Sequence, residues 1–131
     1  MLIFGHKYID SPNFIKIDSK EELHLTTPKD IVLIELKEPY TLPKYLKDNN
    51  ISYAVFIDSI KDAIFANIFD ANYVICEFDL AKIIQKIATE YLWDMKILAL
   101  IDSDDMLEKI ALNYIDGVVY KNFLKGGKNE S

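Results

Sequence analysis

The tripeptide Ile-Asp-Ser ends two apolar bursts, residues 53–57 and 97–101, that are typical of β-strands. The first copy supplies Asp58 and Ser59, and the second supplies Asp102 and Ser103. In parallel α/β sheets, ligands bind outside the carboxyl ends of the strands, where these side chains are expected. Two carboxylates at that edge could hold a metal ion or share a proton.

The same repeat also has a structural interpretation. Asp and Ser are preferred helix N-caps, because their side-chain oxygens accept hydrogen bonds from the free backbone N–H groups of the first turn. Ser59 and Asp62 also resemble a weak capping box. We therefore expect Asp58, Ser59, Asp102 and Ser103 to serve mainly in starting helices, and we keep a ligand role as the alternative.

Further polar residues fall at the ends of neighbouring apolar segments. The ligand candidates at this expected acidic edge are Glu35, Asp58, Ser59, Glu77, Asp102, Ser103 and Lys121. A small enzyme, or a protein that binds a metabolite or a metal ion, could use the carboxylates among them. No single residue is assigned a catalytic role.

The cysteine and the two histidines favour structural roles. Cys76 ends an apolar segment, and a reactive thiol needs a base or a positive helix end, whereas Glu77 beside it would raise the thiol pKa. His6 follows Gly5, so a ligand contact is the alternative to a structural role there, and His24 is expected at the surface. Because the sequence has no Cys/His cluster with metal-ligand spacing, we expect no metal site.

Composition argues against several classes of partner. All 15 basic residues are lysines, and the net charge is −6 with a pI near 4.8. Neither nucleic acid nor an anionic membrane is therefore an expected partner. The chain has four glycines and lacks both the G-x-G-x-x-G and the P-loop patterns, so no nucleotide cofactor is expected.

The pattern of apolar segments indicates a cytoplasmic protein. Lys or Asp interrupts every apolar burst before the roughly 20 residues needed to span a bilayer. The N-terminus lacks the basic head, long apolar middle and cleavage site of a secretory signal. The lone cysteine cannot form an internal disulfide.

Strand-like and helix-like segments alternate along most of the chain. The predicted strands are residues 31–36, 53–57, 73–76, 97–101 and 117–120, and the predicted apolar stripe of the longest helix is Leu80, Ile83, Ile84, Ile87, Tyr91 and Leu92. The strand segments are continuously apolar, as in strands covered on both faces. The alternation predicts an α/β fold with a mostly parallel central sheet of five to seven strands and helices on both faces.

The chain is expected to form a single domain over residues 1–124. Residues 1–30 are predicted to be an N-terminal extension with two short strands that add an edge to the sheet. Ser19 is expected to cap a helical turn there, with Glu22 reaching back. Residues 31–124 form the repeated βα core, and the polar residues 125–131 are predicted to be a disordered tail.

Residues 59–87 resemble the last third of a response-regulator receiver domain, a flavodoxin-like α/β domain. In that family, a helix and a small-residue turn lead to a strand and then to Lys-Pro-Phe, where this chain has Cys76-Glu77-Phe78. The segment "DGVVYKNFL" is more similar, since it supplies Lys121. Ser103 matches the hydroxyl residue that follows the fourth receiver strand.

The resemblance implies no phosphorylation site. Glu35 and Glu38 loosely match the paired acids of a receiver, but the position of the phosphorylated aspartate offers Cys76 and Glu77, with no aspartate before Asp79. We therefore expect no aspartyl phosphate. The same βα pattern also resembles phosphate-binding (βα)-barrel fragments, so it identifies the fold more than the family.

The helix predicted after Ser59 carries apolar residues on two sides. Ile60, Ile64 and Ile68 form one stripe, which is expected to face the core, and Phe65 and Phe69 fall well around the cylinder from it. A second apolar side in so small a chain favours contact with another chain. We therefore predict that Phe65 and Phe69 form an interface.

Two hypotheses about function follow from these observations. The first is a non-catalytic regulatory or protein-binding module that self-associates or binds another protein. The second is a small enzyme, or a metabolite- or metal-binding protein, that uses the acidic edge. An apolar helical interface would favour the first, and a ligand bound at the strand ends would favour the second.

Overall fold

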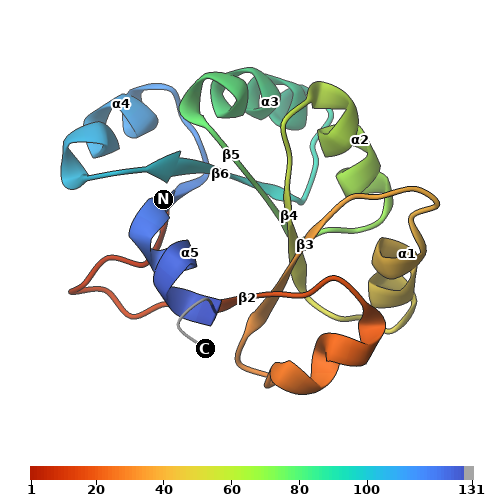
Figure 1. The fold of residues 1–131 in the computed structure, drawn as a ribbon. Coiled ribbons are helices and arrows are strands. Elements are labelled where there is room, and N and C mark those ends of the chain that lie inside the picture. Colours follow the sequence, from red (N-terminus) through yellow and green to blue (C-terminus); the bar gives the residue numbers. More distant parts are fainter. Residues whose placement is uncertain (129–131) are drawn as a thin grey trace.

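The computed structural model describes the backbone of residues 1–128 and the side chains of residues 1–124. Seven parallel strands form one curled sheet (Figure 1). They are β1 (Leu2–Phe4), β2 (Phe14–Lys16), β3 (Ile31–Glu35), β4 (Tyr53–Phe56), β5 (Tyr73–Cys76), β6 (Lys96–Ile101) and β7 (Gly117–Tyr120). Every predicted strand is present, and its bounds differ from the prediction by at most one residue.

Five α-helices and two 3₁₀ helices accompany the sheet. They are η1 (Lys20–Leu25), α1 (Thr41–Asp48), α2 (Ile60–Ile68), α3 (Phe78–Glu90), η2 (Asp104–Met106), α4 (Leu107–Leu112) and α5 (Lys121–Lys128). Residues 129–131, the end of the expected tail, lie outside the described residues, and so do the side chains of residues 125–128.

The strand order is β1-β7-β6-β5-β4-β3-β2, with every neighbouring pair parallel. The predicted fold class is therefore confirmed: an α/β fold with a parallel sheet, helices on both faces and an N-terminal strand extension. The extension adds both edges, because β1 pairs with β7 while β2 pairs with β3.

From β2 to β7, each strand lies beside the next strand of the sequence. Right-handed crossovers that always advance in one direction place their helices on the same face of a sheet. Accordingly, α1 to α4 surround the outer face and α5 lies on the inner face (Figure 1). This sequential order is that of (βα)-barrel fragments, whereas doubly wound flavodoxin-like sheets reverse direction at their first strand.

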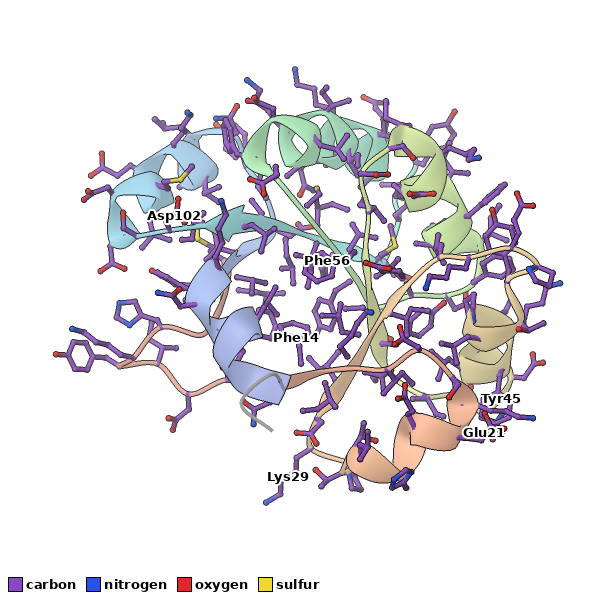
Figure 2. The ribbon with its side chains drawn as sticks, viewed as in Figure 1. Phe14, Glu21, Lys29, Tyr45, Phe56 and Asp102 are labelled. Atoms are coloured by element: carbon purple, nitrogen blue, oxygen red, sulfur yellow. The ribbon has the colours of Figure 1, made fainter. Side chains whose placement is uncertain are left out.

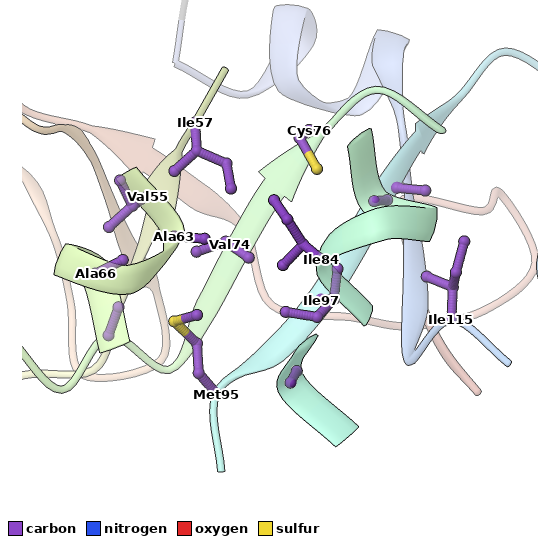
Figure 3. Close-up of a cluster of buried hydrophobic side chains, with 14 of the residues drawn as sticks. Val55, Ile57, Ala63, Ala66, Val74, Cys76, Ile84, Met95, Ile97 and Ile115 are labelled. Atoms are coloured by element: carbon purple, nitrogen blue, oxygen red, sulfur yellow. The ribbon is translucent and has the colours of Figure 1, made fainter. Parts of the chain in front are cut away.

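The outer layer packs through small residues. In α2, Ala63 and Ala66 are fully buried and face Val55 and Val74 of the sheet (Figure 3). The expectation that Ile60, Ile64 and Ile68 face the core is wrong, because they are 39, 40 and 54 % exposed. Alanines let the helix axis approach the sheet closely, and this rotates the larger side chains outward.

The apolar stripe predicted for α3 is only partly correct. Ile84 is fully buried, whereas Ile83 is 48 % exposed and Tyr91 and Leu92 lie beyond the end of the helix with 73 and 85 % exposure. Ala81 and Ala88 complete the buried face. As in α2, alanines take positions against the sheet, and this leaves apolar side chains on the solvent side.

The inner face is covered by aromatic side chains. Phe4 and Phe14 come from strands at opposite edges of the sheet, yet their ring centroids are only 5.0 Å apart. Phe14 lies inside the curl beside α5 (Figure 2), where Phe123 packs against its ring at 6.3 Å. A Cβ on Gly5, whose φ is +90°, would come within 2.4 Å of Phe123, so glycine permits the seating of α5.

No helix within residues 1–128 combines the length and the apolar character needed to cross a membrane.

Candidate functional site

Because the strands are all parallel, their carboxyl ends gather at one edge of the sheet. Asp102 lies there, directly after β6 (Figure 2). Glu77 follows β5 and Lys121 follows β7. The prediction that these polar residues occupy one edge agrees with their positions in the chain order of the sheet.

Lys121 lies between two of the predicted carboxylates. Its Nζ is 3.6 Å from Oε1 of Glu77 and 3.7 Å from Oδ1 of Asp102. The three side chains come from the ends of adjacent strands, which brings the three charges together. One lysine partly compensates two carboxylates, so this part of the edge carries a reduced negative charge.

A second cluster at this edge joins His6, Asp104 and Tyr120. The Tyr120 hydroxyl donates to Oδ1 of Asp104 at 2.5 Å, and Nε2 of His6 lies 3.3 Å from the same oxygen. The backbone N–H of Tyr8 donates to Nδ1 of His6 at 3.1 Å. Because Nδ1 accepts that bond, neutral His6 carries its proton on Nε2 and donates to Asp104.

The cluster changes the acidity of two of its members. Hydrogen bonds from Tyr120 and then from His6 lower the pKa of Asp104 below its ordinary value. Desolvation, followed by the hydrogen bond to Asp104 and its charge, raises the pKa of Tyr120 to about 12. Both shifts favour the protonation states that keep the hydroxyl–carboxylate bond intact.

Sequence reasoning missed this cluster. His6 was expected to have a structural role, and its contacts with Asp104 and Tyr120 fasten the loop after β1 to the loop after β6. No spacing in the sequence joins residues 98 positions apart. The cluster could have been predicted only from the pairing of β1 with β7, which places the end of β1 beside Tyr120.

The helix starts of the Ile-Asp-Ser repeat are capped by serine. The Ser59 hydroxyl accepts from the Asp62 N–H at 3.1 Å, and the Ser103 hydroxyl accepts from the Asp105 N–H at 3.3 Å. The interpretation of the repeat as a helix start is confirmed, but the expectation that its aspartates are the caps is wrong. Both aspartates precede the cap position by one residue and are exposed.

A hollow of 520 Å³ opens at the ends of β3 and β4. Its lining is Glu35, Leu36, Phe56, Ile57, Asp58 and Asp62. Within the described residues, no ion pair joins any of its three carboxylates to a lysine or histidine. This hollow therefore presents uncompensated negative charge, unlike the part of the edge around Lys121.

Cys76 is buried in the outer core, as predicted (Figure 3). Desolvation, and then the charge of Glu77, raises the pKa of its thiol to about 12. His24 is exposed, as expected. In residues 1–128, no three His, Cys, Asp or Glu side chains are placed to hold a metal ion together.

Phe65 and Phe69 lie on a flank of α2 that faces the loop before α1. The ring of Tyr40 packs against both of them, with centroid distances of 5.4 Å to Phe65 and 5.6 Å to Phe69. Both phenylalanines are half-buried. Their predicted role in an interface stays a prediction, and contacts within the chain already account for part of their burial.

The other flank and the crest of α2 carry its exposed apolar residues. We call the set Ile60, Ile64 and Ile68, with Ile83 of the neighbouring helix α3, the isoleucine face. All four side chains are 39–54 % exposed. Helices α2 and α3, which carry these four residues, are neighbours in the outer layer (Figure 1).

Comparison with known proteins gives no family. No protein-family model matches the chain, and no curated protein matches it.

Proposed function

We propose that the protein is a non-catalytic module that acts through protein contacts, and that the isoleucine face is its contact surface. The observation that supports this proposal most directly is the exposure of Ile60, Ile64 and Ile68 on a helix whose other sides are all engaged. Their spacing of four residues sets them in one continuous row. A row of isoleucines in water is typical of a docking surface.

The remaining parts of α2 have partners within the chain. Ser59 caps its start, and the buried Tyr53 hydroxyl donates to the Phe69 carbonyl at its end at 2.5 Å. Alanines bury its inner side, and Tyr40 covers one flank. The isoleucine row is the most exposed apolar part of the helix, with Ile60, Ile64 and Ile68 at 39, 40 and 54 % exposure.

Docking on the isoleucine face would bury apolar surface that is now exposed to water. Full burial of an isoleucine side chain stabilises a complex by about 1.5–3 kcal/mol relative to exposure. Since each side chain of the isoleucine face is already about half-buried, docking would recover roughly 1 kcal/mol for each of the four. That gain is enough to favour association only when surrounding surface contributes as well.

A site-specific photocrosslink in cells that naturally make the protein tests the proposal. A benzophenone side chain at position 64 is expected to give an adduct of discrete mass, which disappears when Ile60 and Ile68 are both changed to lysine. Position 44, an exposed lysine of α1, is the matched control and should give no such adduct. Equal labelling at positions 64 and 44, or an adduct insensitive to the lysines, would contradict the proposal.

A second candidate function uses the hollow between Glu35 and Asp58. Its three uncompensated carboxylates at the carboxyl ends of parallel strands favour a positively charged ligand. Magnesium and calcium ions are the simplest probes. If the hollow binds either ion, added ion should raise the melting temperature, and Asp58→Asn should abolish the rise. An unchanged melting temperature would remove divalent ions from consideration.

A further inference from the structure

We infer that a hollow at the amino ends of β5 and β6 is a binding site for a neutral sugar ring. The hollow measures 850 Å³, and its lining includes Asn72, Tyr91, Trp93, Asp94 and Lys96. Small-molecule sites have volumes of roughly 300–1,000 Å³. The hollow shares no residue with the isoleucine face, so the inference goes beyond the proposed function and does not depend on it.

Two of the lining residues carry near-parallel aromatic rings. The rings of Tyr91 and Trp93 are inclined by 26°, with centroids 6.3 Å apart, and Tyr91 is 73 % exposed. In a continuing helix, side chains two residues apart would point to nearly opposite sides of the axis. These two rings come together because Leu92 between them has a left-handed backbone, with φ at +56°.

Backbone hydrogen bonds hold this turn in place. The Leu92 N–H donates to the Thr89 carbonyl at 3.3 Å, and the Trp93 N–H donates to the Ala88 carbonyl at 2.9 Å. Glycine or asparagine is the usual residue at the left-handed position after a helix, since other side chains are strained there. The turn keeps a leucine in spite of that cost, and its hydrogen bonds fix the aromatic pair before a ligand binds.

Polar side chains from two neighbouring turns complete the lining. The side-chain carbonyl of Asn72 accepts from the Tyr53 N–H at 3.0 Å, which orients the amide and leaves the N–H groups of Nδ2 as donors. Asp94 offers carboxylate acceptors and Lys96 offers ammonium donors. No ion pair among the described residues includes Asp94 or Lys96.

This mixture of rings, donors and acceptors favours a sugar over other ligands. A hydroxyl group both donates and accepts, so a sugar can bond to an amide, a carboxylate and an ammonium alike. The C–H face of a pyranose ring is apolar and can pack flat on an aromatic ring. A cation would be repelled by Lys96, and an anion by Asp94 and by Asp70, which also lines the hollow.

The fluorescence of Trp93 tests the inference, because it is the single tryptophan of the chain and lines the hollow. The purified full chain is titrated with glucose, galactose, mannose, xylose and N-acetylglucosamine, each to high millimolar concentration. At least one of these sugars should change the emission with a saturable dependence. Sorbitol, which has the hydroxyl groups but no ring, should give no saturable change.

Two variants locate the binding. Tyr91→Ala removes a ring and Asp94→Asn removes a charged acceptor, so each should weaken the binding of the responsive sugar by about tenfold. Both residues are exposed, so both variants should fold. Tyr114→Ala is the matched control and should bind as the wild type does. Tyr114 is 86 % exposed and also follows its helix at φ +56°, but it does not line the hollow.

The inference would be overturned if none of the five sugars gives a saturable change, or if Tyr91→Ala and Asp94→Asn leave that change as it is in the wild type. A saturable response to tetramethylammonium and to no sugar would also overturn it, because the hollow would then bind cations through its rings. None of these results affects the isoleucine face, which the photocrosslink at position 64 tests separately.

Discussion

On one flank of helix α2, Phe65 and Phe69 lie against the ring of Tyr40, whereas Ile60 and Ile64 on the other side face solvent. Both sets are large and apolar, and both have the spacing of a helical stripe. They differ in what the rest of the chain brings to them. The loop between β3 and α1 supplies an aromatic ring to one flank, whereas Ile60, Ile64 and Ile68 stay 39, 40 and 54 % exposed.

The difference shows that apolar periodicity identifies a stripe without identifying its partner. Against the sheet, α2 uses alanines, which bury little area but permit close approach. The large side chains are then left for lateral contacts. The residues with the greatest capacity for burial are therefore those that a second chain can still cover.

The largest expected effect concerns the alanine side of α2. Ala66→Leu should lower the free energy of unfolding by about 1–3 kcal/mol, because the added atoms must enter space already filled by Val55 and Val74. Ile64→Leu is the matched control at an exposed position and should change stability by less than about 0.5 kcal/mol. Chemical denaturation of both variants measures the difference, and equal losses would mean that the two sides are equally buried.

The next effect concerns the start of the helix. Ser59→Ala should cost about 0.5–2 kcal/mol, because it removes the acceptor for the Asp62 N–H. Asp58→Ala, one residue earlier, should stay within about 0.5 kcal/mol of the wild type. Urea midpoints at constant slope are the appropriate measurement. A larger loss from Asp58→Ala would restore that aspartate as the cap.

The covered flank can be tested by a double-mutant cycle. Tyr40→Ala and Phe69→Ala should show a coupling of about 0.5–1.5 kcal/mol, the value typical of an aromatic pair. The same cycle between Tyr40→Ala and Ile64→Ala should show no coupling, because the Tyr40 ring packs on the flank of α2 that carries Phe65 and Phe69. Additive losses for Tyr40 and Phe69 would mean that the flank is not held by this ring.

The last prediction concerns the reaction rates of a buried and an exposed cysteine thiol, with little expected effect on stability. The native Cys76 has a thiol pKa raised to about 12, so at pH 8 it should react slowly with a disulfide reagent at every protein concentration. The thiol of Ile64→Cys should react quickly in dilute solution and more slowly as the protein is concentrated, because association covers it. If the reaction rate of Ile64→Cys does not change with protein concentration, position 64 is exposed but the chain does not self-associate through it.

Much of the architecture could be predicted from the sequence because its signals are local. Continuous apolar segments separated by amphipathic stretches specify parallel strands and crossovers, and the seven strands appear where the pattern predicts them. The two serines of the repeat sit before helices, where their side chains accept backbone hydrogen bonds. Such features depend on residues only a few positions apart.

Features that depend on non-local pairing could not be predicted. The cluster of His6, Asp104 and Tyr120 exists because β1 enters the sheet beside β7 instead of beside β2. The exposure of Ile64 depends on the rotation of α2 that places Ala63 and Ala66 against the sheet. The hydrophobic pattern alone does not show whether the alanines or the isoleucines face the sheet. Lys121 was expected at the edge, but its position between Glu77 and Asp102 required the strand order.

Sedimentation velocity over a range of concentrations tests the central claim most directly. The wild-type chain should form a dimer at the higher concentrations. The double variant Ile64→Lys with Ile68→Lys should be a monomer at all of them, with an unchanged thermal midpoint because both positions are exposed. A wild type that stays monomeric throughout, or a double variant that dimerises as the wild type does, would contradict the account.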